Sequence, residues 1–230
     1  MIRRPPRSTP SNSSAASDVY KRQAEDTPDW LDWDFWLGPA PWRPYNKLLH
    51  PYKWRSWRDY SGGNITDWGA HHFDIIQWAL GMDESGPVEF LPAEPAKKLP
   101  LRYRYANGVE VRHVGWSGPR FIGTRGEVYV DRGKLLTKPE GLANVKIAAT
   151  EIRLRRVRSH RDDFLECIRT RRRPICDVET GCRSVTVCHA VNICKWLGRA
   201  LRWDPAKEVF VGDDEANRMR SRAKREPWTT

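Results

Sequence analysis

The chain has 230 residues, of which 40 are basic and 29 acidic, so its formal net charge is +11 at pH 7. No apolar run approaches the roughly 20 residues that span a bilayer, so the composition argues against a membrane protein. A basic chain can attract nucleic acid, but between Arg153 and Arg173 the arginines are interrupted by Asp162, Asp163 and Glu166. That mixture is typical of a solvated helix face, and we expect no nucleic-acid partner.

Residues 1–23 differ from the rest of the chain. Ile2, Val19 and Tyr20 are their only sizeable apolar side chains among Arg, Pro and Ser, so no periodic apolar face can form. The segment resembles translated sequencing-adapter read-through, and we interpret it as non-native or as a disordered basic arm. Without it, 35 basic and 28 acidic residues remain, a net charge of +7. The remaining length suits one large domain or two small ones.

A segment rich in tryptophan and proline runs from Asp29 to Tyr60. Prolines at this density prevent a long helix, so the pattern predicts a short helical turn followed by an ordered loop. The rings could stack on a sugar, but a structural role is favoured, in which the aromatic rings are buried and fix a long connecting loop.

The next segment, Ser61–Asp74, is followed by a helical pattern that extends to Leu80. Gly62 and Gly63 permit a tight turn, and Thr66 is in a position to cap the helix. Helical spacing predicts a core stripe with Gly81 as the stop. The stripe consists of Phe73, Ile76 and Leu80.

Asp67 and His71 are four residues apart in this predicted helix, so they share one face, which Asp74 continues. A carboxylate that orients an imidazole suits proton transfer near neutral pH, because histidine has an ordinary pKa of about 6.5. His72 points about 100° away from His71, and we interpret it as structural. The spacing alone is also found in many inert helices.

The chain then changes to a period of two, with turn residues between short runs, which predicts successive hairpins and a largely antiparallel sheet. The predicted strands lie at 88–91, 101–105, 109–114, near Phe121, 127–130 and 134–136. Helices are predicted at 160–171 and 179–201, with a short one within 213–221. The fold class is therefore α+β. Five cysteines fit no CxxC spacing, so we expect reduced thiols and no metal site.

Several strings together resemble the C-terminal domain of the Gfo/Idh/MocA oxidoreductases, relatives of glucose-fructose oxidoreductase and inositol dehydrogenase. The strings are LDWDFWLGPAPWRPYN, WRSWRDYSGGNITDWGAHHFDIIQWALGM, FIGTRGEVYVDRG, and DFLECIRTRRRPICDVETG leading to LRWDPAKEVFVGDDEANR. The resemblance implies that residues 24–230 form a substrate and oligomerisation domain, an open and mostly antiparallel sheet with helices on one face. The family's Rossmann domain is missing, because no GxGxxG follows a strand and the catalytic lysine motif has no counterpart.

By resemblance, the parent enzyme uses NAD or NADP to oxidise a secondary alcohol of a sugar or cyclitol. His71 would be the general base and Asp67 would orient it, while Asp74 either touches the substrate or holds His71. Three further candidates for substrate contact lie just before the motif, where they could reach sugar hydroxyls or a carboxylate: Arg55, Arg58 and Tyr60. Exposed structural roles are equally compatible with their positions.

The resemblance implies three further expectations. The chain alone should bind no dinucleotide, because the cofactor domain is absent from it. A homo-oligomer is expected through the free face of the sheet. The alternative is a non-enzymatic oligomerisation or scaffold module that keeps only this sheet domain. A cytoplasmic location is favoured, with export left open.

Overall fold

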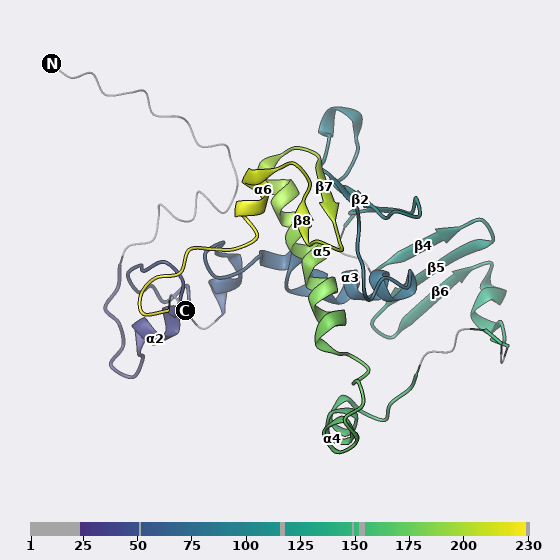
Figure 1. Ribbon diagram of the computed structural model, residues 1–230, viewed down its shortest axis with the longest axis horizontal. Coiled ribbons are helices and arrows are strands. Elements are labelled where there is room, and N and C mark those ends of the chain that lie inside the picture. The colour runs from purple at the N-terminus through teal and green to yellow at the C-terminus, as the bar shows by residue number, and fades with distance from the viewer. Residues whose placement is uncertain (1–23, 51, 116–117, 149, 152–154, 229–230) are drawn as a thin grey trace. The chain divides into compact units, whose positions relative to one another are not determined.

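The structure is a computed structural model that describes residues 24–50, 52–115, 118–148, 150–151 and 155–228. These residues form two compact units (Figure 1). One unit holds the described residues up to Asp67 together with those from Ser221 onward, and the other is Trp68–Arg220. The arm inferred at residues 1–23 lies outside the described residues, and the boundary of the expected domain at 24–230 stays a prediction. No helix in the described part of the chain has the length and apolarity needed to cross a membrane.

The first unit is an aromatic cluster around one short helix. This helix, α2 (Trp33–Leu37), begins after Asp32, whose side chain accepts a hydrogen bond from the backbone N–H of Phe35. The remaining regular structure consists of two 3₁₀ turns, Lys53–Ser56 and Gly63–Ile65. The buried core consists of Trp33, Leu37, Tyr45 and Leu49, with Leu31, Trp36, Trp57 and Tyr60 packed against it. Trp33, Trp36 and Trp57 therefore fix the loop, as predicted, whereas Trp30 and Trp42 are exposed.

The second unit begins with α3 (Trp68–Ala79), the helix that carries His71. It starts one residue later than a cap at Thr66 would place it, so the prediction of Thr66 as its cap was wrong. Thr66 instead ends the preceding 3₁₀ turn and its hydroxyl donates to the carbonyl of Gly63 at 3.1 Å. Gly81 follows the helix with a φ of 66°, which confirms the predicted stop.

A five-stranded antiparallel sheet forms the centre of this unit, in the order β3-β2-β1-β7-β8. Its strands are β1 (Glu89–Leu91), β2 (Arg102–Arg104), β3 (Glu110–Arg112), β7 (Leu201–Asp204) and β8 (Val209–Phe210). Opposite residues such as Phe90 and Tyr103 share one face, which is buried, and the ring of Phe73 on α3 stacks on that of Tyr103 at 5.7 Å. α5 (Val178–Leu197) also contacts β1. Both helices thus cover the same face, as the resemblance implied.

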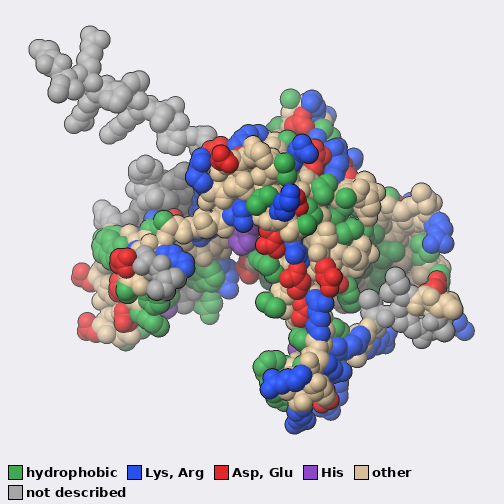
Figure 2. All heavy atoms as spheres, viewed as in Figure 1, with side chains coloured by type: hydrophobic (Ala, Val, Ile, Leu, Met, Phe, Trp, Pro, Cys, Tyr) green, Lys and Arg blue, Asp and Glu red, His purple; other side chains and the backbone are tan. Residues whose placement is uncertain are grey.

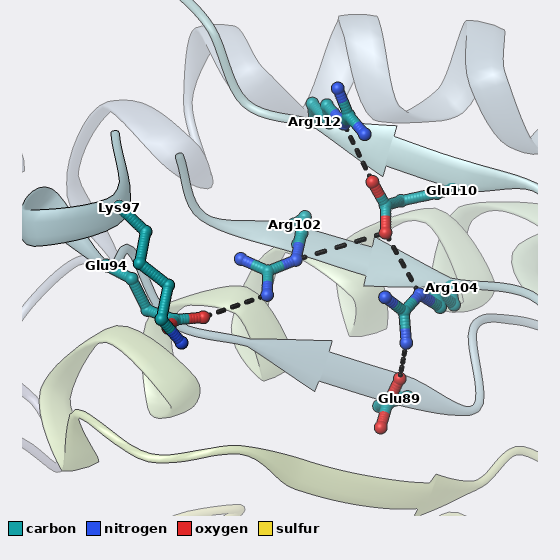
Figure 3. Close-up of polar contacts among 7 residues, drawn as sticks. All are labelled: Glu89, Glu94, Lys97, Arg102, Arg104, Glu110 and Arg112. Atoms are coloured by element: carbon teal, nitrogen blue, oxygen red, sulfur yellow. Dashed lines mark hydrogen bonds and ion pairs between the residues drawn. The ribbon is translucent and has the colours of Figure 1, made fainter. Parts of the chain in front are cut away.

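The opposite face of this sheet is charged rather than apolar (Figure 3). Arginines and glutamates alternate across β1, β2 and β3. The carboxylate of Glu110 pairs with three guanidinium groups, those of Arg102, Arg104 and Arg112. Glu89 pairs with Arg104. The group consists of Glu89, Glu94, Lys97, Arg102, Arg104, Glu110 and Arg112. These charges satisfy each other across the strands. An oligomer contact through a sheet face stays a prediction.

A separate three-stranded antiparallel sheet holds β4 (Arg120–Gly123), β5 (Gly126–Asp131) and β6 (Lys134–Lys138). The α+β class is confirmed, with the antiparallel strands divided between two sheets.

The C-terminal part of this unit differs from the expected helix at 179–201. α5 ends at Leu197 because Gly198 adopts the left-handed conformation, with a φ of 65°, and Leu201 opens strand β7. The predicted helix was therefore too long, and two strands were missed. α4 (His160–Thr170) and the short α6 (Asp214–Arg218) confirm the other two helices.

Basic side chains gather around α4 (Figure 2), where Asp163 is buried and accepts hydrogen bonds from Arg155 and Arg172.

The deepest side chain of α3 is a polar one, Gln77, which is fully buried. Its amide nitrogen donates to the carbonyls of Met82 and Ser85 at 3.0 Å each, and its amide oxygen accepts from the hydroxyl of Tyr105 at 2.6 Å. This amide therefore joins the helix to the sheet and to the turn after the helix. Burial raises the pKa of Tyr105, so the phenol stays protonated and donates throughout the accessible pH range.

Replacing Gln77 with leucine is expected to destabilise the chain by about 2–4 kcal/mol. The Tyr105 hydroxyl loses its acceptor and the Ser85 carbonyl loses a donor, while the Met82 carbonyl keeps only the backbone N–H of Ser85. Tyr105→Phe should cost less, about 1–2 kcal/mol, and the double variant should cost less than the sum of the two. Urea denaturation followed by circular dichroism measures each value. The exposed neighbouring variant Trp78→Leu is the control, with an expected change within about 0.5 kcal/mol. Additive effects of the two core variants would contradict the coupling.

Candidate functional site

His71 lies in the first turn of α3 and its side chain is exposed. Three positions earlier on the same helix is Trp68, whose indole is half exposed and edge-on to the imidazole, with ring centroids 6.4 Å apart. Helix α3 itself is held by Phe73 and Gln77 on its buried side. The candidate base is thus presented to solvent from a rigid element, which is the arrangement a proton-transfer group requires.

Asp67 is the last residue before α3 and belongs to the first unit, whereas His71 belongs to the second. The expectation that Asp67 lies within the helix was wrong by one residue. Its carboxylate forms an ion pair with Arg55, with Oδ2 and Nε 3.1 Å apart. A carboxylate can accept several hydrogen bonds, so this contact leaves room for another donor. The pairing of Asp67 with His71 stays a prediction.

Arg55, one of the predicted substrate contacts, is therefore joined to a second predicted site residue. Its guanidinium also lies over the ring of Trp54, with Cζ 4.9 Å from the centroid. Arg58 follows in a turn and is exposed. The structure thus gives Arg55 fixed surroundings, and the substrate role of both arginines stays a prediction.

Tyr60 has surroundings that favour a packing role. Its ring packs edge-on against Trp36 at 5.5 Å and under the guanidinium of Arg43 at 5.8 Å. Burial raises the pKa of Tyr60 to about 12, against the opposing charge of Arg43. The phenol therefore stays neutral at physiological pH and belongs to the aromatic cluster of the first unit.

Asp74 is bound to the neighbouring helix. Its Oδ1 accepts a hydrogen bond from the hydroxyl of Ser184 on α5 at 2.6 Å, and Ser184 is itself buried. The contact joins the middle of α3 to the second turn of α5. This contact is with Ser184 and not with His71, so both roles left open for Asp74, contact with substrate and holding His71, stay predictions.

Further carboxylates lie near Asp74, around the N-terminal end of α5. The pKa of Asp83 is raised, mainly by burial and then by the charges of Asp74 and Asp177. The pKa of the Cys176 thiol is raised by burial and by the same group of carboxylates. Arg173 offsets this negative charge through its hydrogen bonds to Asp177 and Glu84. The five cysteines all carry free thiols, as expected.

Two residues that the sequence did not indicate also approach this helix. Ser184 is one, and the other is Arg132 at the tip of the β5–β6 hairpin, whose guanidinium lies over Trp68 with Cζ 4.2 Å from the ring centroid. Both come from segments far along the chain, so no local spacing could have found them. Trp68 carries the only sequence signal, an aromatic residue three positions before His71.

A hollow of about 390 Å³ lies elsewhere, on one face of the three-stranded sheet. It is lined by Arg120, Glu127, Tyr129, Leu136, Thr137 and Lys138. None of the predicted site residues lines it. We place the candidate site at α3 rather than at this hollow, because the hollow is a shallow surface of one sheet without a candidate base.

The described residues do not fit a dinucleotide. Every strand pairing among them is antiparallel, whereas a dinucleotide fold needs parallel strands around a glycine-rich turn.

The described residues of the second unit thus form an antiparallel sheet that is covered on one face by helices, and one of these helices carries the exposed His71. A family model described as the oxidoreductase family C-terminal alpha/beta domain, of the Gfo/Idh/MocA group, matches residues 17–230. The chain therefore belongs to the Gfo/Idh/MocA oxidoreductase family and represents its C-terminal domain. No curated protein matches the chain.

The start of α5 yields a prediction on pH. Asp177 caps this helix, and its pKa is lowered from 3.8 to about 2 because Arg173 and the backbone N–H groups of Thr180 and Glu179 donate to it. As the pH falls, the Asp177 carboxylate is protonated first in the unfolded chain and only at lower pH in the folded one. The contribution of ionised Asp177 to the free energy of unfolding is therefore complete above about pH 4 and is lost towards pH 2. Asp177→Asn should therefore cost more stability at pH 6 than at pH 2.

Urea midpoints of the wild type and of Asp177→Asn at both pH values measure this difference. Asp214→Asn is the matched control, because Asp214 is an exposed carboxylate in the first turn of another helix. An equal cost of Asp177→Asn at both pH values would contradict the ionic contribution.

Proposed function

We propose that this chain supplies the substrate-binding and acid–base part of an NAD(P)-dependent oxidoreductase that acts on a secondary alcohol of a sugar or cyclitol. In this proposal a nucleotide-binding domain precedes it in a longer polypeptide. The observation that carries the proposal is the exposed His71 on the first turn of an anchored helix, in a chain of this oxidoreductase family.

Oxidation of a secondary alcohol removes the proton of the hydroxyl group, and His71 is the side chain assigned to accept it. A positioned general base contributes about 10²–10⁴-fold to the rate of such a step. Asp67 is assigned to orient the imidazole and to stabilise its charged form, as carboxylates do beside catalytic histidines. When bound, NAD or NADP supplies the acceptor for the hydride. The residues of this chain provide the base and the surface against which the sugar lies.

Three side chains are proposed to contact the substrate besides the base. Arg55 is held by Asp67 and Trp54, so its guanidinium is oriented before any ligand arrives. Arg58 is exposed close by in the sequence. Asp74 keeps its second carboxylate oxygen beyond the one that Ser184 occupies. Tyr60 is assigned to packing, because its ring lies within an aromatic cluster.

In the longer enzyme, His71→Gln is expected to lower kcat by about 10²–10⁴-fold and to leave KM nearly unchanged, because glutamine keeps the size of the side chain but cannot accept the proton. The assay follows nicotinamide absorbance over a panel of sugars and cyclitols with NAD and with NADP. His160→Gln is the control, since His160 is an exposed histidine at the start of α4. A His71→Gln enzyme that keeps most of its kcat would refute the proposal.

The 230-residue chain alone is expected to bind neither NAD nor NADP, because its described residues form no dinucleotide fold. Isothermal calorimetry of the chain with each oxidised and reduced cofactor measures this. Fusion of the chain to a nucleotide-binding domain of the same family is the positive control. A micromolar dissociation constant for the isolated chain would overturn the prediction.

A further inference from the structure

The tip of the β5–β6 hairpin meets the first turn of α3. Arg132 at this tip places its guanidinium carbon 4.2 Å from the centroid of the Trp68 ring, the geometry of a cation–π contact. The same ring lies edge-on to His71 at 6.4 Å. One exposed indole therefore holds a cation and the candidate base on the same small surface, entirely within the second unit.

The hairpin tip is fixed by its own hydrogen bonds. Asp131 accepts the backbone N–H of Arg132 through Oδ1 at 2.7 Å and the hydroxyl of Tyr129 through Oδ2 at 3.1 Å. These two hydrogen bonds lower the pKa of Asp131, and the nearby charges of His72 and Lys134 lower it further. The contact between helix and hairpin is therefore that of Trp68 with Arg132.

The charge of Arg132 is not neutralised by a carboxylate. Within the part of the chain that the structure describes, no ion pair includes Arg132, although its neighbour on the same sheet, Arg120, is paired with Glu127. The arginines on the outer face of the larger sheet are likewise paired with glutamates (Figure 3). Arg132 is therefore an oriented guanidinium, exposed to solvent, with its donors available.

We propose that Arg132, held on Trp68, forms an anion-binding subsite beside His71, so that the substrate carries a carboxylate or a phosphate group. This inference rests on the proposed function of His71 and names the class of sugar or cyclitol that it acts on. A guanidinium binds either anion through two parallel hydrogen bonds, which fixes orientation as well as position. The face of Trp68 that Arg132 leaves open can stack on the apolar side of a sugar ring.

The test measures binding to the 230-residue chain by calorimetry, with glucuronate, glucose 6-phosphate and neutral glucose as probes. Charge-assisted hydrogen bonds predict that one or both anionic sugars bind about tenfold or more tightly than glucose, and that added salt reduces this preference. The relative affinity of glucuronate and glucose 6-phosphate distinguishes a carboxylate from a phosphate.

Arg132→Gln should remove the preference for anionic sugars, and Trp68→Leu should weaken it, because the guanidinium loses its support. The matched control is Arg125→Gln, an exposed arginine at the tip of the neighbouring β4–β5 hairpin, which should keep the full preference. Equal binding of glucose and both anionic sugars to the wild type, or an equal loss in the Arg125 variant, would overturn the proposal.

This readout does not depend on oxidation, so the two proposals fail separately. An Arg132-dependent preference for anionic sugars, found together with a His71→Gln enzyme of normal kcat, would support the subsite and refute the role of His71. A normal effect of His71→Gln with no preference among sugars would do the reverse.

Discussion

The buried amide of Gln77 is the contact on which the position of the candidate site depends. It lies on the face of α3 opposite to solvent and joins the helix to Tyr105 on the sheet and to the turn that follows the helix. Because all its hydrogen-bonding groups are directional, the amide specifies one rotation and one depth of α3, whereas apolar packing alone tolerates several. With α3 held in this rotation, His71 lies on the exposed side of the helix.

Asp74 adds a second directional contact along the same helix, to Ser184. The two contacts connect α3 to different partners, the sheet through Gln77 and α5 through Asp74. A helix held only at its buried apolar stripe could rotate or slide slightly, and either motion would move the imidazole. Polar contacts at two heights of the helix restrict both motions, which is the support that a catalytic side chain needs.

Much of this was accessible from the sequence. The period of two predicted six of the eight strands, because turns such as Asn107-Gly108 separate alternating residues within each hairpin. The sequence could not predict strand β7, since Leu201 continues the apolar spacing of α5 and only the left-handed conformation at Gly198 ends the helix. Gln77 was also missed, because a glutamine within a helical pattern is usually a solvent-facing residue.

The candidate site was likewise predicted from the sequence only in part. His71 and Asp67 were accessible as a local spacing, and Arg55 as a neighbour in the sequence. The contact of Asp67 with Arg55 needed the turn between them, which moved Asp67 out of the helix by one residue. Arg132 is 61 residues after His71, and only the fold of the hairpin brings it to Trp68. Long-range pairs of this kind leave no periodic signal in a single sequence.

The distance between Arg132 and His71 is set by regular structure rather than by a free loop. Trp68 and His71 are one turn apart on the same helix, and Arg132 is held by a hairpin whose tip is closed by Asp131. A cation that binds the anionic group of a ligand at a fixed distance from a base restricts which carbon of that ligand the base can reach. Since effective concentration falls steeply with small misplacements, the proposed pair of Arg132 and His71 would select one hydroxyl among the several that a sugar offers. In that proposal the rigid Trp68 platform determines the position oxidised as well as the charge of the ligand.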